Sequence, residues 1–179
     1  MNRGGSSKRL NWDEFFIVLA TLYSSRGTCN RLRTACILVK NKKIVGAGYN
    51  GAVSGLDNCD VVGHLMIGNH CLRTQHGERN AIDNSIADLY GATAYVIGTP
   101  CLNCVKSLLQ KGVTRIVYVG SYSNAEGQEY IQEMCLQKQV ILEQWASDPI
   151  DVFDLLGQAF RRLKCKGGLF KDLGHLAIG

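Results

Sequence analysis

Four residues in the middle of the chain have the types and spacing of a catalytic zinc site. His76 precedes Glu78 by two positions, and Cys101 and Cys104 form a Cys-x-x-Cys pair further along. Zinc binds imidazole nitrogen and thiolate sulfur in a tetrahedral array, and a catalytic zinc keeps its fourth position for water. Cysteines at this spacing in the first turn of a helix point the same way, and the helix dipole favours their thiolate forms. His76, Cys101 and Cys104 therefore predict a three-ligand zinc site.

Glu78 lies near this site without being needed as a ligand. A carboxylate there can take a proton from zinc-bound water and deliver it to a pyrimidine ring nitrogen and then to the leaving amine. One histidine, a nearby glutamate and a Cys-x-x-Cys pair form the signature of zinc deaminases that act on nucleobases. The simpler alternative, two buried helix cysteines without a metal, accounts for Cys101 and Cys104 but leaves His76 and Glu78 unexplained.

A second group of possible metal ligands lies in and around residues 51–74, a stretch without helical or strand periodicity. A loop of this length in a compact domain is usually functional or held by another interaction. A closed Cys/His site would hold it, since a structural zinc contributes folding free energy. We favour three cysteines with one histidine, His64 in preference to His70; packing cysteines and solvated histidines are the alternative. The candidates are Cys29, Cys59, His64, His70 and Cys71.

The composition is that of a globular domain. The chain has 179 residues, 46% of them hydrophobic and 20% charged, which excludes a disordered, collagen-like or coiled-coil protein. No apolar run approaches the roughly 20 residues that a bilayer requires, and the N-terminus lacks the apolar stretch of a secretory signal. We therefore expect a cytoplasmic protein whose eight cysteines are thiols or metal ligands. The net charge of +5 favours an anionic ligand, although denser basic clusters are usual for nucleic-acid binding.

Helix-like and strand-like segments alternate along the chain, which predicts an α/β sandwich. The first two strands form an antiparallel hairpin, and helical crossovers between the last three predict parallel pairing. We expect one domain over residues 11–163, between a flexible tail at 1–10 and a loosely ordered tail at 164–179. The predicted helices are 11–24, 75–89, 101–111, 126–137 and 149–163, and the predicted strands are 34–40, 43–49, 93–98, 115–119 and 140–144.

These motifs resemble the cytidine deaminase superfamily, and within it the bacterial and phage branch of the deoxycytidylate (dCMP) deaminases. The similarity rests on the metal motifs, on Gly-Tyr-Asn-Gly at 48–51 and on His-Cys-Leu-Arg-Thr at 70–74. The resemblance implies a cytidine-deaminase-like three-layer α/β/α sandwich with a five-stranded mixed sheet. It also implies zinc-dependent hydrolysis of dCMP to dUMP and ammonia, which feeds thymidylate synthesis. A homo-oligomer, commonly a hexamer, activated by dCTP and inhibited by dTTP, is expected on the same ground.

The resemblance assigns roles to individual residues. His76, Cys101 and Cys104 match the zinc ligands of the family, and Glu78 matches its proton shuttle. Asn50 matches the asparagine that hydrogen-bonds the substrate sugar, and several relatives are similar in carrying a second, structural zinc. Effector contacts are expected in the segment formed by Gly48, Tyr49, Asn50 and Gly51.

Binding of a nucleotide phosphate requires cationic donors, and arginine suits this role because its contacts can be bidentate. The candidates are Arg31, Arg33 and Arg73, each with a solvated surface position as its alternative. Tyr122 is a candidate for the base pocket or for packing. Gly77 stands where the family usually has alanine. The missing methyl predicts a pocket widened toward a C5-substituted base, or only a looser helix start.

Two other functions are compatible with these motifs. A zinc deaminase acting on C5-modified dCMP, or on a base in tRNA or single-stranded DNA, would share the metal ligands. The ligand-rich loop favours a mononucleotide, because it would cover a pocket that a polymer must enter. A non-catalytic zinc module is the third possibility, but a structural zinc has no use for a carboxylate beside a three-ligand metal.

Overall fold

The computed structural model describes residues 9–68, 70–120, 127–146 and 151–163, so most of both predicted tails lies outside the described residues. None of the helices in these ranges is long and apolar enough to cross a membrane. The helices are α1 (Trp12–Ser24), α2 (Cys59–Val62), α3 (Gly77–Asp83), α4 (Leu102–Gln110), α5 (Gln128–Gln137) and α6 (Asp151–Leu163). The strands are β1 (Ala35–Lys40), β2 (Lys43–Tyr49), β3 (Met66–Ile67), β4 (His70–Cys71), β5 (Thr93–Ile97), β6 (Arg115–Val119) and β7 (Ile141–Ala146).

Five of the strands form one mixed sheet in the order β2-β1-β5-β6-β7. β1 pairs antiparallel with β2 and β5, whereas β5, β6 and β7 are parallel. The parallel strands are connected through α4 and α5, as parallel neighbours require a long crossover. The predicted hairpin, the parallel pairing and the three-layer α/β/α sandwich are confirmed.

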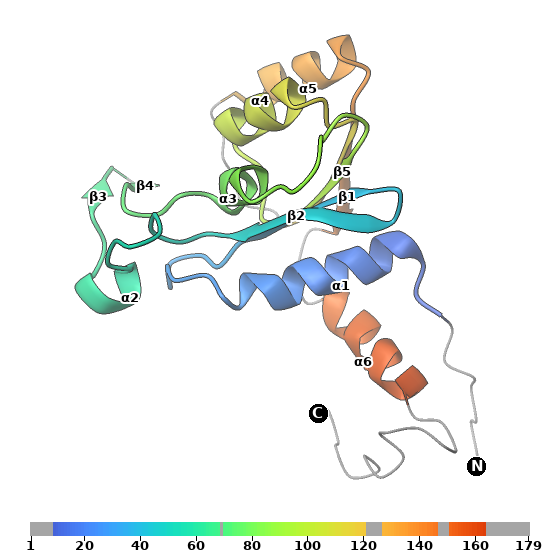
Figure 1. The fold of residues 1–179 in the computed structure, drawn as a ribbon, viewed down its shortest axis with the longest axis horizontal. Coiled ribbons are helices and arrows are strands. Elements are labelled where there is room, and N and C mark those ends of the chain that lie inside the picture. Colours follow the sequence, from blue (N-terminus) through green and yellow to red (C-terminus); the bar gives the residue numbers. More distant parts are fainter. Residues whose placement is uncertain (1–8, 69, 121–126, 147–150, 164–179) are drawn as a thin grey trace.

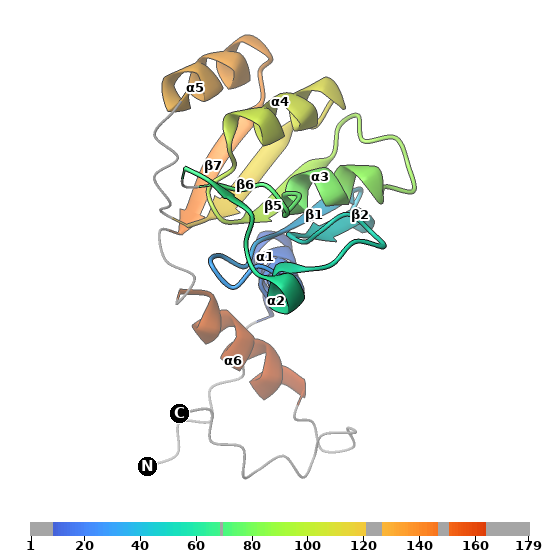
Figure 2. The same ribbon diagram turned by 90° about the vertical axis from the view of Figure 1, so that its left-hand side faces the viewer.

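Helices cover both faces of this sheet (Figures 1 and 2). α1 and α6 lie on one face, and α3, α4 and α5 lie on the other. Side chains alternate along β1, so Ile37 and Val39 join the core under α1, whereas Cys36 and Leu38 join the core under α3. β1 is therefore buried on both faces, which explains its continuous apolar run.

Local sequence signals explain two of the element boundaries. Asn11 caps α1 through a capping box, in which its side chain accepts from the Glu14 nitrogen and the Glu14 carboxylate accepts from the Asn11 nitrogen. The β1–β2 turn places Asn41 and Lys42 at φ values of 52° and 62°. Two successive positive φ values are typical of the tight turn that suits the twist of a hairpin.

Two segments differ in detail from their predictions. The helix predicted at 75–89 is shorter, because α3 ends at Asp83 and the Ile86 nitrogen donates to the Val45 carbonyl of β2 at 2.9 Å. Residues 51–74 contain α2 and the two-stranded β3–β4 sheet. Elements this short cannot produce a recognisable hydrophobic period.

α3 lies directly on the backbone of β2, and a glycine makes this close approach possible. A Cβ atom at Gly48 would lie 2.2 Å from the Ala81 nitrogen and 2.5 Å from the Gly77 carbonyl oxygen. Both neighbours are backbone atoms, so no side chain can move aside to make room. Gly48 therefore determines how closely α3, the helix that carries Glu78, lies above the sheet.

We expect Gly48→Ala to lower the free energy of unfolding by about 1–3 kcal/mol, because the added methyl forces backbone to move. Gly157→Ala is a matched control, since a Cβ there would meet only the mobile end of Arg161. Alanine within a helix is about 0.5–1 kcal/mol more favourable than glycine, so this control should be neutral or stabilising. Urea denaturation measures the free energy of unfolding of both variants. Equal changes in the two variants would contradict the assigned close approach.

A partly buried ionic network joins α1 to the sheet. Arg115 donates to both Asp13 oxygens, at 2.7 and 2.9 Å, and also to Glu143 at 2.7 Å. The Tyr95 hydroxyl donates to Asp13 as well. The Arg115 guanidinium holds the pKa of Asp13 below its ordinary value of 3.8. These bonds fix α1 across three strands.

The stabilisation from Asp13 should depend on pH. Because its pKa is lower in the folded state, the contribution is complete above about pH 3.8 and is lost as the pH falls through the folded-state pKa. Asp13→Asn should therefore be less stable than wild type at pH 7, and the difference should shrink below pH 3.8. Denaturation curves at several pH values measure this, and a difference independent of pH would refute it.

Candidate metal centres and active-site cavity

His76, Cys101 and Cys104 come together where two helices begin. His76 is the N-cap of α3, and Cys101 is the N-cap of α4. The Nδ1 atom of His76 lies 3.4 Å from Cys101 Sγ and 3.3 Å from Cys104 Sγ. Ligand atoms around a tetrahedral zinc are about 3.5–3.8 Å apart when the bonds are about 2.0–2.3 Å. The three side chains therefore fit a single zinc ion.

The pKa values of the two thiols in this group shift in opposite directions. A hydrogen bond from Cys104, opposed by burial, lowers the pKa of Cys101 to about 4. The same bond and the burial of Cys104 raise the pKa of Cys104, and a hydrogen bond with Cys101 raises the pKa of His76. Metal binding requires deprotonated ligands and releases such protons. Binding of a divalent cation here would release the protons of these side chains.

Glu78 lies in the first turn of α3, beside these ligands. The residue is only 5% exposed, and burial raises its pKa above the ordinary value of 4.5. Cys104 contributes a hydrogen bond to its carboxylate. A carboxyl group with a raised pKa can accept and release a proton closer to neutral pH, as the predicted shuttle requires.

Two of the metal ligands and Glu78 face one cavity of about 570 Å³, a size typical of small-molecule sites. His76, Glu78 and Cys101 form part of its wall. Other parts of the wall come from the loop before β1, from Asn50, from residues 70–72 and 74, and from the segment between the end of β5 and the start of α4. The sequence analysis did not identify several polar side chains of this wall as functional. Their position near the predicted metal ligands was the one feature of the sequence that could have indicated them. They are Thr34, Thr74, Thr99 and Asn103.

Asn50 lies in the cavity wall at the end of β2, as its predicted role requires. Its side chain donates to the Leu32 carbonyl at 2.6 Å and accepts from the Thr34 nitrogen at 2.9 Å. These bonds fix both the Asn50 side chain and the loop before β1. The Asn50 amide has a second hydrogen and further acceptor capacity that a ligand could use. The contact between Asn50 and a sugar remains a prediction.

The neighbours of Asn50 position α3. Gly51 and Gln75 exchange two backbone hydrogen bonds, at 3.1 and 2.8 Å, immediately before His76. Asn80 donates to the Tyr49 carbonyl at 2.8 Å. The Gly-Tyr-Asn-Gly segment therefore ties the end of β2 to the helix that carries the metal ligand and Glu78. Contact of this segment with the effectors dCTP and dTTP remains a prediction.

Of the three predicted phosphate-binding arginines, the structure places Arg31 in the cavity wall. Arg33 donates to the Gly27 carbonyl at 3.1 Å, and Arg73 donates to the Gly63 carbonyl at 3.2 Å. Both of these arginines lie outside the set that lines the cavity. Arg31 is thus the best placed of the three to meet a phosphate.

The expectation that Gly77 widens the pocket is wrong. A Cβ atom at this position would lie 3.0 Å from Ala35 Cα and 3.2 Å from the Gly48 carbonyl oxygen, so it would point at the sheet. The absent methyl therefore adds no space to the cavity, and its effect is confined to the packing of α3. Tyr122, the other candidate for the base pocket, lies outside the described residues.

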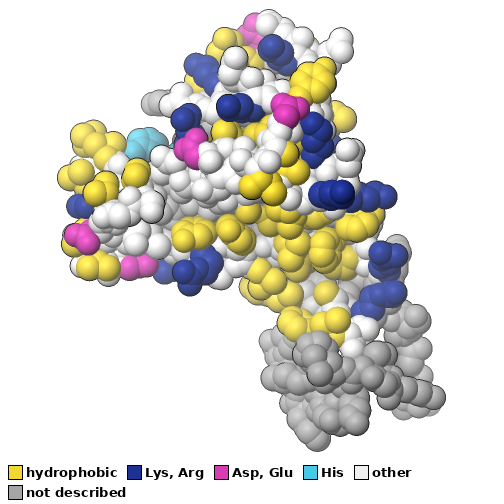
Figure 3. Space-filling view, in the orientation of Figure 1, with side chains coloured by type: hydrophobic (Ala, Val, Ile, Leu, Met, Phe, Trp, Pro, Cys, Tyr) yellow, Lys and Arg dark blue, Asp and Glu magenta, His cyan; other side chains and the backbone are white. Residues whose placement is uncertain are grey.

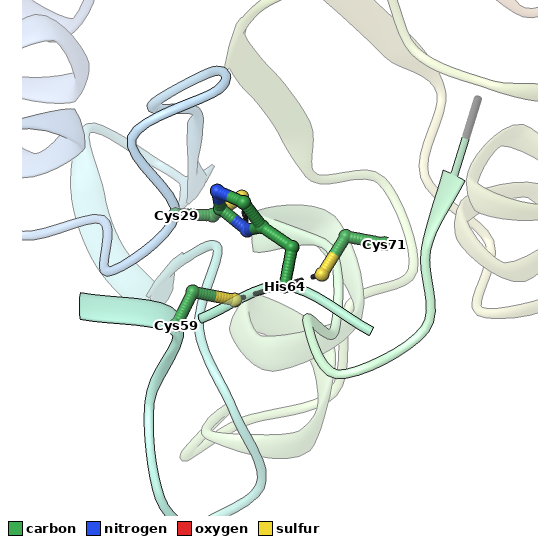
Figure 4. A group of neighbouring side chains, drawn as sticks. All are labelled: Cys29, Cys59, His64 and Cys71. Atoms are coloured by element: carbon green, nitrogen blue, oxygen red, sulfur yellow. Dashed lines mark hydrogen bonds between the residues drawn. The ribbon is translucent and has the colours of Figure 1, made fainter. Parts of the chain in front are cut away.

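A second ligand group forms at the edge of the same cavity, where side chains from separate parts of the chain converge (Figure 4). Cys59 and Cys71 have their sulfur atoms 3.6 Å apart, and Cys29 Sγ lies 3.7 Å from His64 Nδ1. All four ligand atoms lie within 4.8 Å of one another. These separations also match the edges of a tetrahedral zinc site. His64 belongs to this group, whereas His70 lies in the cavity wall.

Two polar residues support this second group. Asn30 Oδ1 lies 2.9 Å from His64 Nε2, which leaves Nδ1 directed at the cluster. The Thr74 hydroxyl lies 3.3 Å from Cys59 Sγ and 3.7 Å from Cys71 Sγ. Such bonds orient the ligands of a metal site. Burial raises the pKa of Cys59. Burial also acts to raise the pKa of Cys71, but hydrogen bonds, that of Thr74 the strongest of them, outweigh it and lower the pKa to about 6.

Comparison with known proteins identifies a family and several relatives to which this chain is similar. The family described as cytidine and deoxycytidylate deaminase zinc-binding region matches residues 10–120. ComE operon protein 2 of Bacillus subtilis is 35% identical over 174 residues, which cover 96% of this chain and 89% of that protein. Deoxycytidylate deaminase of Mycobacterium phage D29 is 33% identical over 125 residues, covering 62% of this chain and 95% of that protein.

A solved structure has the same fold. The crystal structure of dCMP deaminase from cyanophage S-TIM5, in complex with dCMP and dUMP, aligns with a TM-score of 0.65 and 27% identity. The alignment covers 76% of this chain and 98% of the phage chain. The mixed five-stranded sheet and its flanking helices are thus shared with that enzyme.

Proposed function

The chain belongs to the cytidine and deoxycytidylate deaminase family, and from this premise we propose that it is a zinc-dependent hydrolase that converts dCMP to dUMP and ammonia. The observation that carries the proposal is the ligand group of His76, Cys101 and Cys104, which stands beside Glu78 at a cavity lined by His76, Cys101 and Glu78. The deoxycytidylate deaminases among its relatives, and the phage enzyme bound to dCMP and dUMP, support this substrate.

The metal ligands and Glu78 have separate roles in the reaction. His76, Cys101 and Cys104 would hold a zinc ion, which would lower the pKa of water and so supply a nucleophile at neutral pH. Glu78 accepts a proton from that water and delivers it to the ring nitrogen next to the reacting carbon, to which the water oxygen adds. The Glu78 carboxylate then takes the remaining proton of the added hydroxyl group and passes it to the amino group, which leaves as ammonia while the carbonyl forms. Burial of Glu78 suits it to both proton transfers, because it raises the pKa of the carboxyl group.

The nucleotide is held by other residues of the cavity wall. Asn50 hydrogen-bonds the deoxyribose, and Arg31 meets the phosphate. The product dUMP would feed thymidylate synthesis. The second group, Cys29, Cys59, His64 and Cys71, holds a structural zinc that shapes the cavity, since Cys29 and Cys71 also line its wall.

The enzyme acts as a homo-oligomer, a hexamer by its resemblance to the family, with dCTP as activator and dTTP as inhibitor. Exposed apolar side chains supply the interface that an oligomer needs. Figure 3 shows such side chains along α1 and toward α6. They include Trp12, Phe15, Leu22, Tyr23, Phe153 and Phe160, each at least 37% exposed.

The test is ammonia release from dCMP by zinc-loaded protein, with and without dCTP, together with the sedimentation mass of the same sample. Turnover that rises with dCTP in an oligomeric sample supports the reaction and its regulation. Turnover without a dCTP response refutes the regulation alone. No turnover of dCMP, but turnover of C5-modified dCMP or of cytosine in single-stranded DNA, would refute the proposed substrate.

A further inference from the structure

A second cavity, of about 390 Å³, lies between α3 and α4, and we call it the α3–α4 groove. Among the described residues, none lines both this groove and the cavity beside Glu78. Three cations line the groove: Arg79 of α3, Lys106 of α4, and Lys111 at the C-cap of α4. Asp83 is the one carboxylate among the described lining residues, so the groove carries a net charge of +2. Its size suits a small molecule, and its charge favours an anion.

The two lysines of the α3–α4 groove keep their charges unneutralised. Lys106 Nζ lies 5.7 Å from the ring centroid of Tyr130, in a cation–π contact that leaves the positive charge in place. Neither Lys106 nor Lys111 has a carboxylate within ion-pair distance in the part of the chain that the structure describes. A lysine at a helix C-terminus is favoured by the helix dipole. That effect explains Lys111 alone, but it does not explain three cations in one groove.

Arg79 brings a guanidinium group that is only partly used by the protein. Its Nε atom donates to Asp83 at 3.2 Å, and Asp83 also accepts from Gln75 at 3.1 Å. Within the described ranges, Asp83 is the hydrogen-bond partner that the structure gives this guanidinium. The two terminal nitrogens of Arg79 can therefore contact a ligand, in the bidentate manner that arginine uses for phosphates. Ser107 and Gln110 add neutral donors to the groove wall.

We propose that the α3–α4 groove binds an anion made of linked phosphoryl groups, as in inorganic triphosphate. Such a chain offers a separate anionic group to each of the three cations, whereas a single carboxylate can meet one or two of them. Arginine matches phosphate oxygens in pairs, and the lysines act as point charges. Because its contacts come from both helices, the bound anion ties α3 to α4. These are the helices whose N-termini carry His76 and Cys101.

The test is calorimetric titration of the zinc-loaded protein with sodium triphosphate at low ionic strength. We expect one site per chain, and a melting temperature that rises with triphosphate concentration, because a ligand of the folded state stabilises it. Lys106→Gln and Lys111→Gln should each weaken binding by about tenfold, the order expected for one charge-assisted hydrogen bond. Added salt should also weaken binding, since the cations of the groove are exposed.

Two control variants separate this groove from other basic positions. Lys138→Gln is matched to Lys111→Gln, because Lys138 is likewise an exposed C-cap lysine, at the end of α5, and lies outside the groove. Arg31 lines the cavity beside Glu78, so Arg31→Gln should leave the affinity for triphosphate unchanged. Titration with ATP identifies the source of the phosphates. Equal affinities for ATP and triphosphate indicate a site for the phosphate chain alone, whereas tighter binding of ATP indicates a nucleotide site.

Any of three results would overturn the proposal. They are no binding of triphosphate by the wild-type protein at low ionic strength, equal losses of affinity in Lys111→Gln and Lys138→Gln, and a loss in Arg31→Gln as large as that in Lys111→Gln. Binding to the groove does not require turnover. None of these results therefore bears on the proposed deamination, which ammonia release tests separately.

Discussion

Glu78→Gln should lower kcat for dCMP by about 10²- to 10⁴-fold, the range usual for the loss of a general acid–base group. Glutamine keeps the length and planar shape of the side chain, but it cannot carry a proton between water, ring and amine. His76, Cys101 and Cys104 are untouched, so the metal ligands stay in place. The measurement is steady-state ammonia release alongside zinc content.

Folding provides the internal control for Glu78→Gln. Glu78 is buried and burial disfavours its charge, so a neutral amide should leave the melting temperature equal or higher. Glu133→Gln is a matched variant, because Glu133 is exposed and its carboxylate accepts a hydrogen bond from Gln137 of the same helix. Its turnover should equal wild type. A Glu78→Gln enzyme within a few-fold of wild type would contradict the proton shuttle.

Cys59→Ala should remove one of two bound zinc ions and release the loop at residues 51–74. This stretch has a four-residue helix and two two-residue strands of its own, so its order depends on the second ligand group. Structural zinc contributes about 10–16 kcal/mol in isolated zinc-finger peptides. Loss of one of four ligands should therefore cause rapid hydrogen exchange or proteolysis at 51–74.

The same variant should affect substrate binding more than chemistry. Cys29 and Cys71 belong to the second ligand group and also line the cavity. Loss of the metal should therefore misplace binding groups of the cavity and raise KM for dCMP by about tenfold. Cys135→Ala is the control, since Cys135 is a similarly buried thiol in α5, away from both groups. It should keep two zinc ions per chain. Two zinc ions in Cys59→Ala would refute the second site.

The order of the elements could be predicted from the sequence because it depends on local signals. The capping box at Asn11 and Glu14, the turn at Asn41 and Lys42, and the alternation along the strands each act within a few residues. The crossover rule then makes the last three strands parallel. The end of α3 could not be predicted, since it depends on the contact between Ile86 and Val45 of another element.

The chemistry of the site was also encoded locally. His76 and Glu78 share one helix start, and Cys101 and Cys104 share another, so their types and spacing alone indicated a zinc deaminase. Short spacing within a helix turn fixes which way side chains point. For this reason the reaction class followed from the sequence.

Only the tertiary structure decided which distant residues meet. It placed Arg31 but not Arg33 or Arg73 in the cavity wall, and it turned the Gly77 position toward the sheet. These outcomes depend on how loops and helices pack across the sheet. Spacing along the chain carries no information about such contacts, because they join segments tens of residues apart.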